Sequence, residues 1–292
     1  MPKVIVGVPV YNGGDQLREC LECLVTQTFA DIEIRIYDNA SQDNTGEIAQ
    51  EFARKDARVK YIRHPENIRA MPNFLRVLQD CEAEFVMWRA HDDLCSQDYI
   101  EKLYNALVAT PNANVAVPTT RTVSRSEKER VSVPRPFDHK SAVGAIVQLM
   151  FNSHAGWFYG LWRRDPLLTD FEECWAAFPH PWALDHLILF PSLLKRAVAI
   201  VPGAIFIQRL VTKSYTPKQG TKPVVGEMVS LRTLFAAQCR RYINRTPYSL
   251  IQKVVLRAAL PFYVDRRVYK LRKVIKRKIL RQKGGSAYSG EF

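Results

Sequence analysis

Two adjacent acidic residues, Asp92 and Asp93, follow an apolar run at residues 84–89 that is typical of a buried strand. A hard divalent cation binds carboxylate oxygens and leaves positions open for a ligand's phosphates, and an acid pair at a strand end suits both needs. The same pair would also suit the start of the next helix, where acidic side chains interact favourably with the helix dipole. From these residues alone, a metal site and a helix start remain equal alternatives.

Asp38 ends a second apolar run, at residues 31–38, and Asn39 follows it. A carboxylate at a strand end can accept hydrogen bonds from a nucleobase or a ribose. Asp and Asn also favour turns for purely local reasons. Both interpretations stay open, although no GxGxxG follows the first apolar run, which argues against dehydrogenases and P-loop enzymes.

Asp185 lies among apolar residues at 182–189, where a solvated carboxylate is unexpected. Partial burial raises the pKa of a carboxylate, which suits a general base. The alternative is a structural role, as a helix cap or as an ion-pair partner of a nearby arginine. The candidate partners are Arg163, Arg164 and Arg196.

The elements that must position these residues alternate along the first 118 residues. Strands are predicted at 3–9, 31–38, 58–63, 84–89 and 113–118, and helices at 15–27, 43–55, 70–81 and 97–109. Such alternation predicts a doubly wound α/β domain with a mostly parallel sheet and helices on both faces. Because ligands bind outside the carboxyl ends of the strands, the polar strand ends should form one site.

The regular alternation of strands and helices ends after residue 118. The second part is predicted to contain a polar loop or irregular hairpin at 119–135, helices at 139–152 and 182–196, a strand or hairpin at 198–208, and a loop at 211–225. An aromatic run at 156–162 suits either a sugar ring or a hydrophobic core. The predicted divisions are 1–118, 119–225, a basic helical extension at 226–283, and a flexible tail at 284–292.

Charge is concentrated near the end of the chain. Residues 240–283 contain 15 lysines and arginines and a single acid, a net charge of +14, whereas residues 1–239 are neutral. From Leu260 onward, apolar residues recur at three- and four-residue spacing between these cations. The pattern predicts one basic amphipathic helix over 260–283 that binds an anionic membrane surface. Nucleic acid is the competing polyanion, disfavoured because stacking aromatic residues are scarce.

Composition narrows the class of protein. A hydrophobic content of 47% is ordinary for a globular protein, and no apolar stretch reaches the length of a membrane span. Six cysteines without paired zinc-ligand spacing predict a reducing compartment. Met1 leads directly into a strand, so we expect no signal peptide and a cytoplasmic location at the membrane face.

The segments VPVYN (from Val8), YDNASQDNT (from Tyr37) and AHDDL (from Ala90), in this order, resemble the family 2 glycosyltransferases with the GT-A fold. The resemblance covers residues 3–118 closely and continues to about residue 215. It implies transfer of a sugar, usually from a UDP-linked donor, with inversion at the anomeric carbon. Mn²⁺ or Mg²⁺ is the implied cofactor, and a glycan or lipid-linked acceptor is the implied partner.

The resemblance also implies residue roles. Pro9, Val10 and Tyr11 match the motif that lines the base pocket, and Asp38 matches the acid that recognises the base. Asp93 matches the metal ligand, Asp92 a ribose or metal contact, and Asp185 the catalytic base; His186 is a weaker metal candidate. These assignments are expectations that the residue types alone do not fix.

The chain departs from the family pattern at three positions. His91 stands where many relatives have an acid, Arg69 occupies a position that relatives fill with glycine, and Pro72 occupies a position that relatives fill with arginine. Arg69, three residues before Pro72, is therefore expected to supply the missing cation to the nucleotide pocket. Two other functions would also use a strand-end site: a nucleotidyltransferase, and a non-catalytic nucleotide sensor whose basic tail binds nucleic acid.

Overall fold

A computed structural model describes residues 1–124, 128–137, 141–210 and 224–279. The strands are β1 Val4–Val10, β2 Ile32–Asp38, β3 Val59–Arg63, β4 Phe85–Trp88, β5 Leu94–Cys95, β6 Val115–Ser124, β7 Glu129–Ser132, β8 Leu161–Arg163 and β9 Val198–Leu210. The helices are α1 Gly14–Val25, α2 Thr45–Lys55, α3 Ala70–Gln79, α4 Tyr99–Ala109, α5 Ala142–Asn152, the 3-10 turn η1 Ala155–Tyr159, α6 Arg164–Ala177, α7 Leu184–Lys195, α8 Val225–Arg245, α9 Leu250–Arg267 and α10 Leu271–Ile279.

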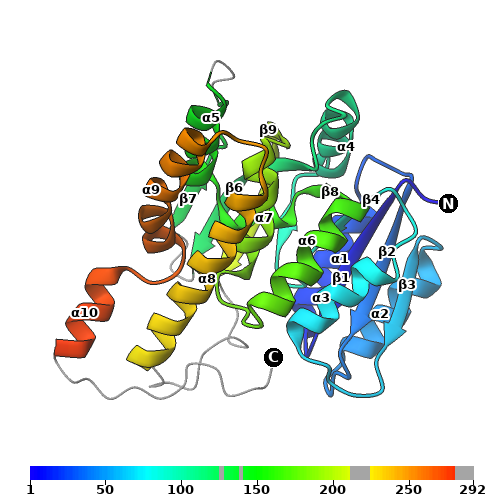
Figure 1. The fold of residues 1–292 in the computed structure, drawn as a ribbon. Coiled ribbons are helices and arrows are strands. Elements are labelled where there is room, and N and C mark those ends of the chain that lie inside the picture. Colours follow the sequence, from blue (N-terminus) through cyan, green and yellow to red (C-terminus); the bar gives the residue numbers. More distant parts are fainter. Residues whose placement is uncertain (125–127, 138–140, 211–223, 280–292) are drawn as a thin grey trace.

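One sheet runs through the described part of the chain (Figure 1). Its order is β3-β2-β1-β4-β8-β6-β9-β5, with β7 paired to β6. The long ladders are parallel, whereas β8 and β5 are short antiparallel strands. The predicted α/β fold with a mostly parallel sheet is therefore confirmed.

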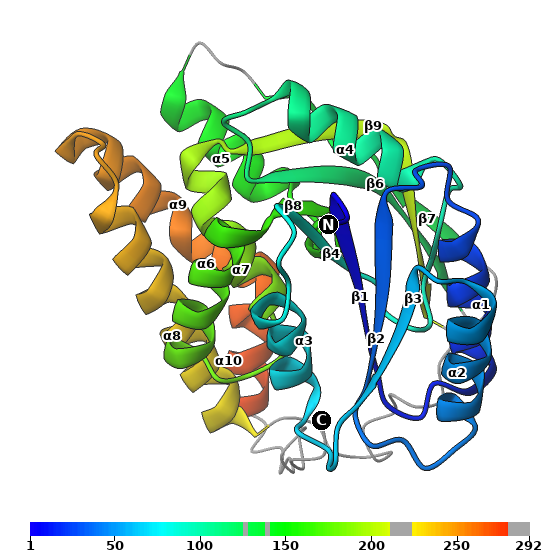
Figure 2. The same cartoon turned by 90° about the vertical axis from the view of Figure 1, so that its right-hand side faces the viewer.

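Both faces of the sheet are covered, which explains why β1 is a continuous apolar run. Val4, Val6 and Val8 pack with α1, α2 and α4, and Ile5 packs on the opposite side with α3 and the later helices. Figure 2 shows α1 and α2 on one side of β1–β3 and α3 on the other. Gly7 allows α3 to lie close, because a Cβ there would be 2.2 Å from Val77 Cγ1.

The region after residue 118 is more ordered than the sequence predicted. β6 continues through the expected division to Ser124, with an irregular register between Pro118 and Thr119, and turns back as β7. β9 pairs with β6 over ten residues. The two predicted halves therefore share one sheet. The predicted loop at 211–225 lies mostly, and the tail at 284–292 entirely, outside the described residues.

The prediction of one continuous basic helix from Leu260 is wrong. Helix α9 begins ten residues earlier and ends at Arg267, and α10 begins after a break. Leu260, Val264 and Val268 of the expected apolar stripe are buried against the protein, whereas Leu271, Ile275 and Ile279 are exposed. The first half of the stripe therefore packs α9 onto the domain, and the second half is exposed on α10. In the described part of the chain, no helix is long and apolar enough to cross a bilayer.

Candidate active site

Three polar strand ends lie side by side at one edge of the sheet. Val10 of β1 is paired with Asp38 of β2, and the backbone N–H of Asn39 donates to Val10 O at 2.8 Å. On the other side of β1, Gly7 is paired with Trp88, the last residue of β4. The strands thus bring the segments after Val10, Asp38 and Trp88 together, as the sequence predicted.

Asp38 is fully buried and has several hydrogen-bond partners. Its Oδ1 accepts from the backbone N–H of Ser41 at 2.8 Å. Its Oδ2 accepts from Tyr61 Oη and Arg63 Nη1, each at 2.7 Å. The carboxylate therefore fixes the turn after β2 and anchors the half-exposed Arg63 at the rim of the site.

The loop after β1 is fastened to the loop after β2. Thr45 Oγ1 accepts from the backbone N–H groups of Gly13 and Gly14 at 2.8 and 3.3 Å. Asn12 has a left-handed backbone with φ +50° and accepts from the N–H of Gln42 at 2.8 Å. The N–H groups of Gly13 and Gly14 at the start of α1 are thus used internally, which agrees with the missing glycine-rich phosphate motif. Pro9 and Val10 are buried beside this loop, and Tyr11 is exposed.

The acid pair follows β4 in a short turn that β9 holds. The backbone N–H of Arg209 donates to Asp93 Oδ1 at 2.8 Å, and its Nε donates to the carbonyl of Asp92. The same guanidinium pairs with Glu19. Asp93 is buried and Asp92 is partly exposed. This arrangement excludes the helix-start alternative, because β5 lies between the pair and α4.

Burial has strong electrostatic effects in this turn. It raises the pKa of Asp93 to about 7, and the negative charge of Asp92 contributes. Burial also lowers the pKa of His91, whose Nε2 has no hydrogen-bond partner within the described chain. Behind the turn, Arg89 is buried over the rings of Tyr99 and Phe206, at 4.8 and 4.9 Å, and its positive charge partly opposes the shift at Asp93.

Asp185 lies in the first turn of α7 and makes none of the ion pairs found among described residues. The expected arginine partners lie elsewhere: Arg163 pairs with Glu84 and Arg164 with Asp165. Asp185 Oδ1 accepts from the backbone N–H of His186 at 2.7 Å. Burial raises the pKa of Asp185 to about 6, and the positive charge of Arg267 opposes this shift.

Tyr159 connects the two acidic regions. Burial holds the pKa of its hydroxyl well above its usual value, and the charges of Asp93, Asp92 and Asp185 add to this effect. The three carboxylates therefore lie close enough to Tyr159 to act on its hydroxyl electrostatically. The aromatic run is otherwise core, because Trp157, Phe158 and Trp162 are buried.

Arg69 occupies a backbone conformation suited to glycine, with φ +73° and ψ 165°. Its side chain is exposed beside the start of α3. One turn later, the buried Asn73 donates its amide to the carbonyl of Tyr37 at 2.9 Å and ties α3 to β2. Arg69 therefore lies near the end of β2, in a strained conformation at the position where the sequence resemblance leads us to expect glycine.

His186 does not join the acid pair. Its imidazole is buried, its Nδ1 lacks a partner within the described chain, and burial holds its pKa well below the usual value. Arg267 and His154 contribute positive charge on this side of α7. Among described residues, no three His, Cys, Asp or Glu side chains form a group that could hold a metal ion. Within the described residues, the acid pair therefore offers a metal ion two carboxylates and no third protein ligand of these types.

Sequence reasoning missed Tyr61, Arg63, Arg209 and Tyr159. Tyr61 and Arg63 are two residues apart on β3, so their side chains point to the same face of the sheet. Because β3 is the neighbour of β2, polar side chains near its end could have been predicted to contact Asp38. Arg209 offered no local signal, because its contact with the acid pair depends on the pairing of β9 with β5. Tyr159 was hidden in the aromatic run.

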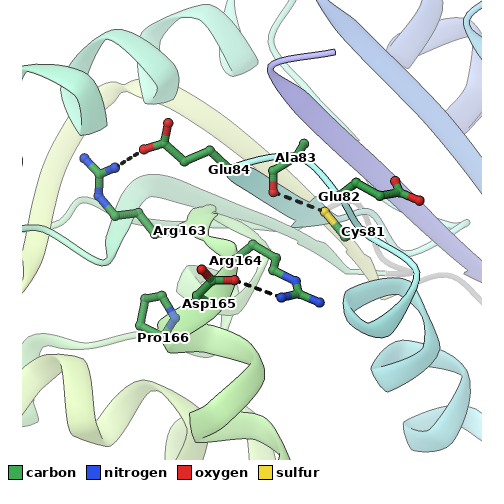
Figure 3. Close-up of a pocket in the computed structure, with 8 residues that line it drawn as sticks. All are labelled: Cys81, Glu82, Ala83, Glu84, Arg163, Arg164, Asp165 and Pro166. Carbon is green, nitrogen blue, oxygen red and sulfur yellow. Dashed lines mark hydrogen bonds and ion pairs between the residues drawn. The ribbon is translucent and has the colours of Figure 1, made fainter. Parts of the chain in front are cut away.

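A hollow of about 510 Å³ lies at the opposite end of β4, where the strand begins (Figure 3). Its charged side chains are already paired, Glu84 with Arg163 and Asp165 with Arg164. Neither the acid pair nor Asp185 lines it. Its position at the amino end of β4 separates it from the candidate active site.

Residues 5–177 match the family description "Glycosyl transferase family 2". This match includes more than half of the chain, from β1 to the end of α6. The chain belongs to glycosyltransferase family 2. The match ends before α7, so it does not include Asp185.

Curated relatives support the same family. The chain is 37% identical over 125 residues to the glycosyltransferase GlyA of Streptococcus pneumoniae, which covers 43% of this chain and 18% of GlyA. It is 34% identical over 115 residues to GlyG of the same organism, covering 39% and 38% of the two chains. The aligned regions thus span less than two fifths of either relative.

Solved structures share the fold. S. aureus TarS 1-349 in complex with UDP-GlcNAc superposes with a TM-score of 0.69 at 15% identity, over 92% of this chain and 74% of that chain. The mannosyltransferase PcManGT from Pyrobaculum calidifontis, in complex with GDP-Man and Mn²⁺, gives 0.53 at 16% identity, over 97% and 76%. The family-type α/β fold predicted from the sequence is therefore confirmed.

Proposed function

We propose that this protein transfers a sugar from a nucleotide-sugar, UDP-linked, to a hydroxyl group of a glycan or lipid-linked acceptor with inversion. The observation that carries the proposal is the acid pair after β4, beside the polar ends of β1 and β2; the charges of this pair and of Asp185 all act on the Tyr159 hydroxyl. One acidic region follows β4, where a nucleotide diphosphate would lie, and the other begins α7. Family membership supports the reaction class, and TarS, a fold neighbour, has been crystallised with UDP-GlcNAc.

The nucleotide would bind over the ends of β1 and β2. Pro9, Val10 and Tyr11 would border the base, with the exposed Tyr11 ring available for stacking. Asp38 would hold Arg63 in place and could reach the base through its remaining acceptor capacity. Arg69 would contribute a further cation at the rim.

The acid pair fits a divalent cation of the Mg²⁺ or Mn²⁺ type, although it supplies only two carboxylates. Such ions commonly bind one or two carboxylates and complete their coordination with water and substrate phosphates. Among described residues, Asp93 accepts one hydrogen bond, from the backbone N–H of Arg209. Burial and the charge of Asp92 raise its pKa in spite of the nearby arginines, so a bound cation would be favourable here. When bound, the metal would offset charge on the departing diphosphate. A metal-bound neighbour, PcManGT, supports this assignment.

Asp185 would remove the proton from the acceptor hydroxyl. Its Oδ1 is oriented by the His186 N–H, and it forms no ion pair with an arginine among the described residues; the charge of Arg267 only partly offsets the rise in its pKa. A carboxylate with a pKa of about 6 is ionised at neutral pH and is more basic than an exposed aspartate. The neighbouring Tyr159 hydroxyl would remain protonated and available as a hydrogen-bond donor.

The test is a donor panel that includes UDP-GlcNAc and GDP-mannose, with MnCl₂ or with EDTA. Binding is measured by calorimetry and turnover by release of the nucleoside diphosphate. We expect a UDP-sugar to bind more tightly with Mn²⁺ and to be hydrolysed slowly without an acceptor. Transfer of a nucleotidyl group, with release of pyrophosphate from a nucleoside triphosphate, would instead support the nucleotidyltransferase alternative.

A further inference from the structure

Helix α9 has apolar residues on both its inner and its outer side. The inner side, which includes Leu256, Leu260 and Tyr263, packs against α8, α5 and α7. The exposed residues Leu250, Ile251, Val254, Val255, Ala258 and Phe262 form what we call the outer face of α9. At 100° per residue, they fall within an arc of about 140° over more than three turns. Ile251 and Phe262 are 77% and 69% exposed.

Cations border the outer face of α9. Lys253 and Arg257 lie along one side of the arc, and Arg266 lies at the other side near the end of the helix. The one acid in this region, Asp265, is paired with Arg232 at 3.1 Å. The border is therefore positive and the centre apolar. Figures 1 and 2 place α9 on an outer flank of the domain, away from β3.

A groove of about 370 Å³ between α8 and α9 adjoins this face. Arg232 and Arg240 line its α8 side, and Pro261, next to Phe262, lines its α9 side. Arg240 is exposed and forms no ion pair with a described residue. The groove thus offers, beside the apolar face, a guanidinium that has no acidic partner in the described part of the chain and suits a phosphate group.

We propose that the outer face of α9 is the surface that docks this protein onto an anionic lipid bilayer. Ile251 and Phe262 enter the boundary between headgroups and acyl chains, and Arg257 and Arg240 bind lipid phosphates. An exposed apolar arc with cationic borders is the composition of helices that lie in a membrane interface. The proposal gives a structural basis to the membrane-surface location expected from the sequence, and it rests on the proposed function only for the lipid-linked acceptor.

Charge favours a bilayer over a second copy of this chain as the occupant. A two-fold symmetric dimer would bring the same patch of both copies together. Residues 240–283 carry a net charge of +14, so that contact would oppose like charges. An anionic bilayer instead attracts the border cations while it covers the apolar centre.

This docking surface differs from the one predicted for a helix over 260–283. Deleting that segment would remove buried residues and the contacts of Arg267 with Ser153, so it would not test docking cleanly. Ile251→Ser/Phe262→Ser alters exposed side chains only. Leu271→Ser/Ile275→Ser tests the exposed part of α10, and Val108→Ser/Val131→Ser is a control at exposed positions elsewhere.

The experiment is co-flotation with vesicles of phosphatidylglycerol and phosphatidylcholine, or of phosphatidylcholine alone. Wild type should float with the anionic vesicles, less so at high salt. Ile251→Ser/Phe262→Ser should lower the partition coefficient about 100-fold, whereas the Val108/Val131 control should not change it. Donor binding and hydrolysis without vesicles should stay unchanged in every variant, so failed docking is distinguishable from failed catalysis.

Four results would overturn the proposal. Equal flotation of wild type and Ile251→Ser/Phe262→Ser would remove the outer face of α9 from docking, and a loss confined to Leu271→Ser/Ile275→Ser would move the contact to α10. A wild-type dimer that the α9 substitutions dissociate would identify a second copy as the occupant. Wild-type protein that ignores vesicles but binds duplex DNA or RNA would assign the cations to nucleic acid.

Discussion

Replacing Asp185 by asparagine should stabilise the protein while stopping catalysis. Burial raises the pKa of this carboxyl to about 6 in the folded protein, from 3.8 as the ordinary value. An acid whose pKa rises on folding prefers to be protonated in the folded state. Its ionisation therefore costs stability, and a neutral amide of nearly the same size avoids that cost.

The size of the stability gain follows from the difference between the pKa of Asp185 in the folded protein and its ordinary value. That difference of about 2 corresponds to at most about 3 kcal/mol of destabilisation of the wild type at pH 8. The cost is absent below pH 4, grows between about pH 4 and 6, and is complete above pH 6. Asparagine keeps the side-chain oxygen that accepts from the His186 N–H. Asp185→Asn should thus unfold at higher denaturant concentration than wild type at pH 8, and at the same concentration near pH 4.

Turnover should change in the opposite direction. Removal of a general base typically lowers the rate by about 10²–10⁴-fold. The wild-type rate should fall about tenfold per pH unit below pH 6, as the base becomes protonated. This acid limb should disappear from the residual activity of Asp185→Asn, while metal-dependent donor binding persists.

Asp170 provides a matched control. It is buried in α6, its Oδ2 has no partner within the described chain, and burial raises its pKa to about 6 as well. Its electrostatic neighbour Lys195 lies at the far end of α7, about 15 Å along the helix from Asp185. Asp170→Asn should therefore gain stability at pH 8 and keep full turnover.

The assays are urea unfolding at pH 4 and pH 8 and the rate of transfer with the donor that the panel identifies. Loss of stability in Asp185→Asn at pH 8 would show that the carboxylate is a structural partner. Near wild-type turnover would remove Asp185 from the mechanism. Loss of turnover in both variants would show that turnover is sensitive to substitution of any buried carboxylate in α6 or α7. It would not identify Asp185 as the general base.

Three further predictions concern the nucleotide side. Asp93→Asn should abolish the gain in nucleoside diphosphate affinity that Mn²⁺ gives, as measured by calorimetry. Equal affinity of the wild type in Mn²⁺ and in EDTA would contradict a metal site at this turn. Arg69→Gly should raise stability by about 1 kcal/mol in urea unfolding, because it relieves a conformation with φ +73°, and unchanged stability would show that the backbone carries no strain. Arg209→Ala should weaken binding of UDP about tenfold, because it removes a cation beside the acid pair. The backbone N–H that donates to Asp93 is kept in this variant. Unchanged affinity would limit Arg209 to a structural contact with Glu19.

The first half of the fold was predictable because its signals are local. A strand buried on both faces, such as β1, must be apolar throughout, and polar residues must follow where it reaches the sheet edge. The positions of Asp38, Asp92 and Asp93 follow from that rule. The role of Arg209 does not, because it is created by a pairing between segments more than a hundred residues apart.

The C-terminal helices show the limit of periodicity. An apolar stripe that includes Leu260, Val264 and Val268 has the same spacing whether it faces a membrane or another helix. Here these three residues face the protein, whereas the later members of the stripe are exposed on α10 and further exposed apolar residues lie on the outer face of α9. Periodicity predicts that a face is covered, and only the tertiary packing decides what covers it.

The pairing of β9 with β6 limits how this protein can be shortened. A chain that stops at residue 177, where the family match ends, would lack β9 and leave the ten-residue edge of β6 with unpaired N–H and C=O groups. Such an edge is a template for intermolecular strand addition. It would also leave Cys95 of β5 without its neighbour Phe206. Versions cut near the family boundary should therefore aggregate during expression, whereas those that continue through α7, β9 and α8 keep the sheet closed at this point.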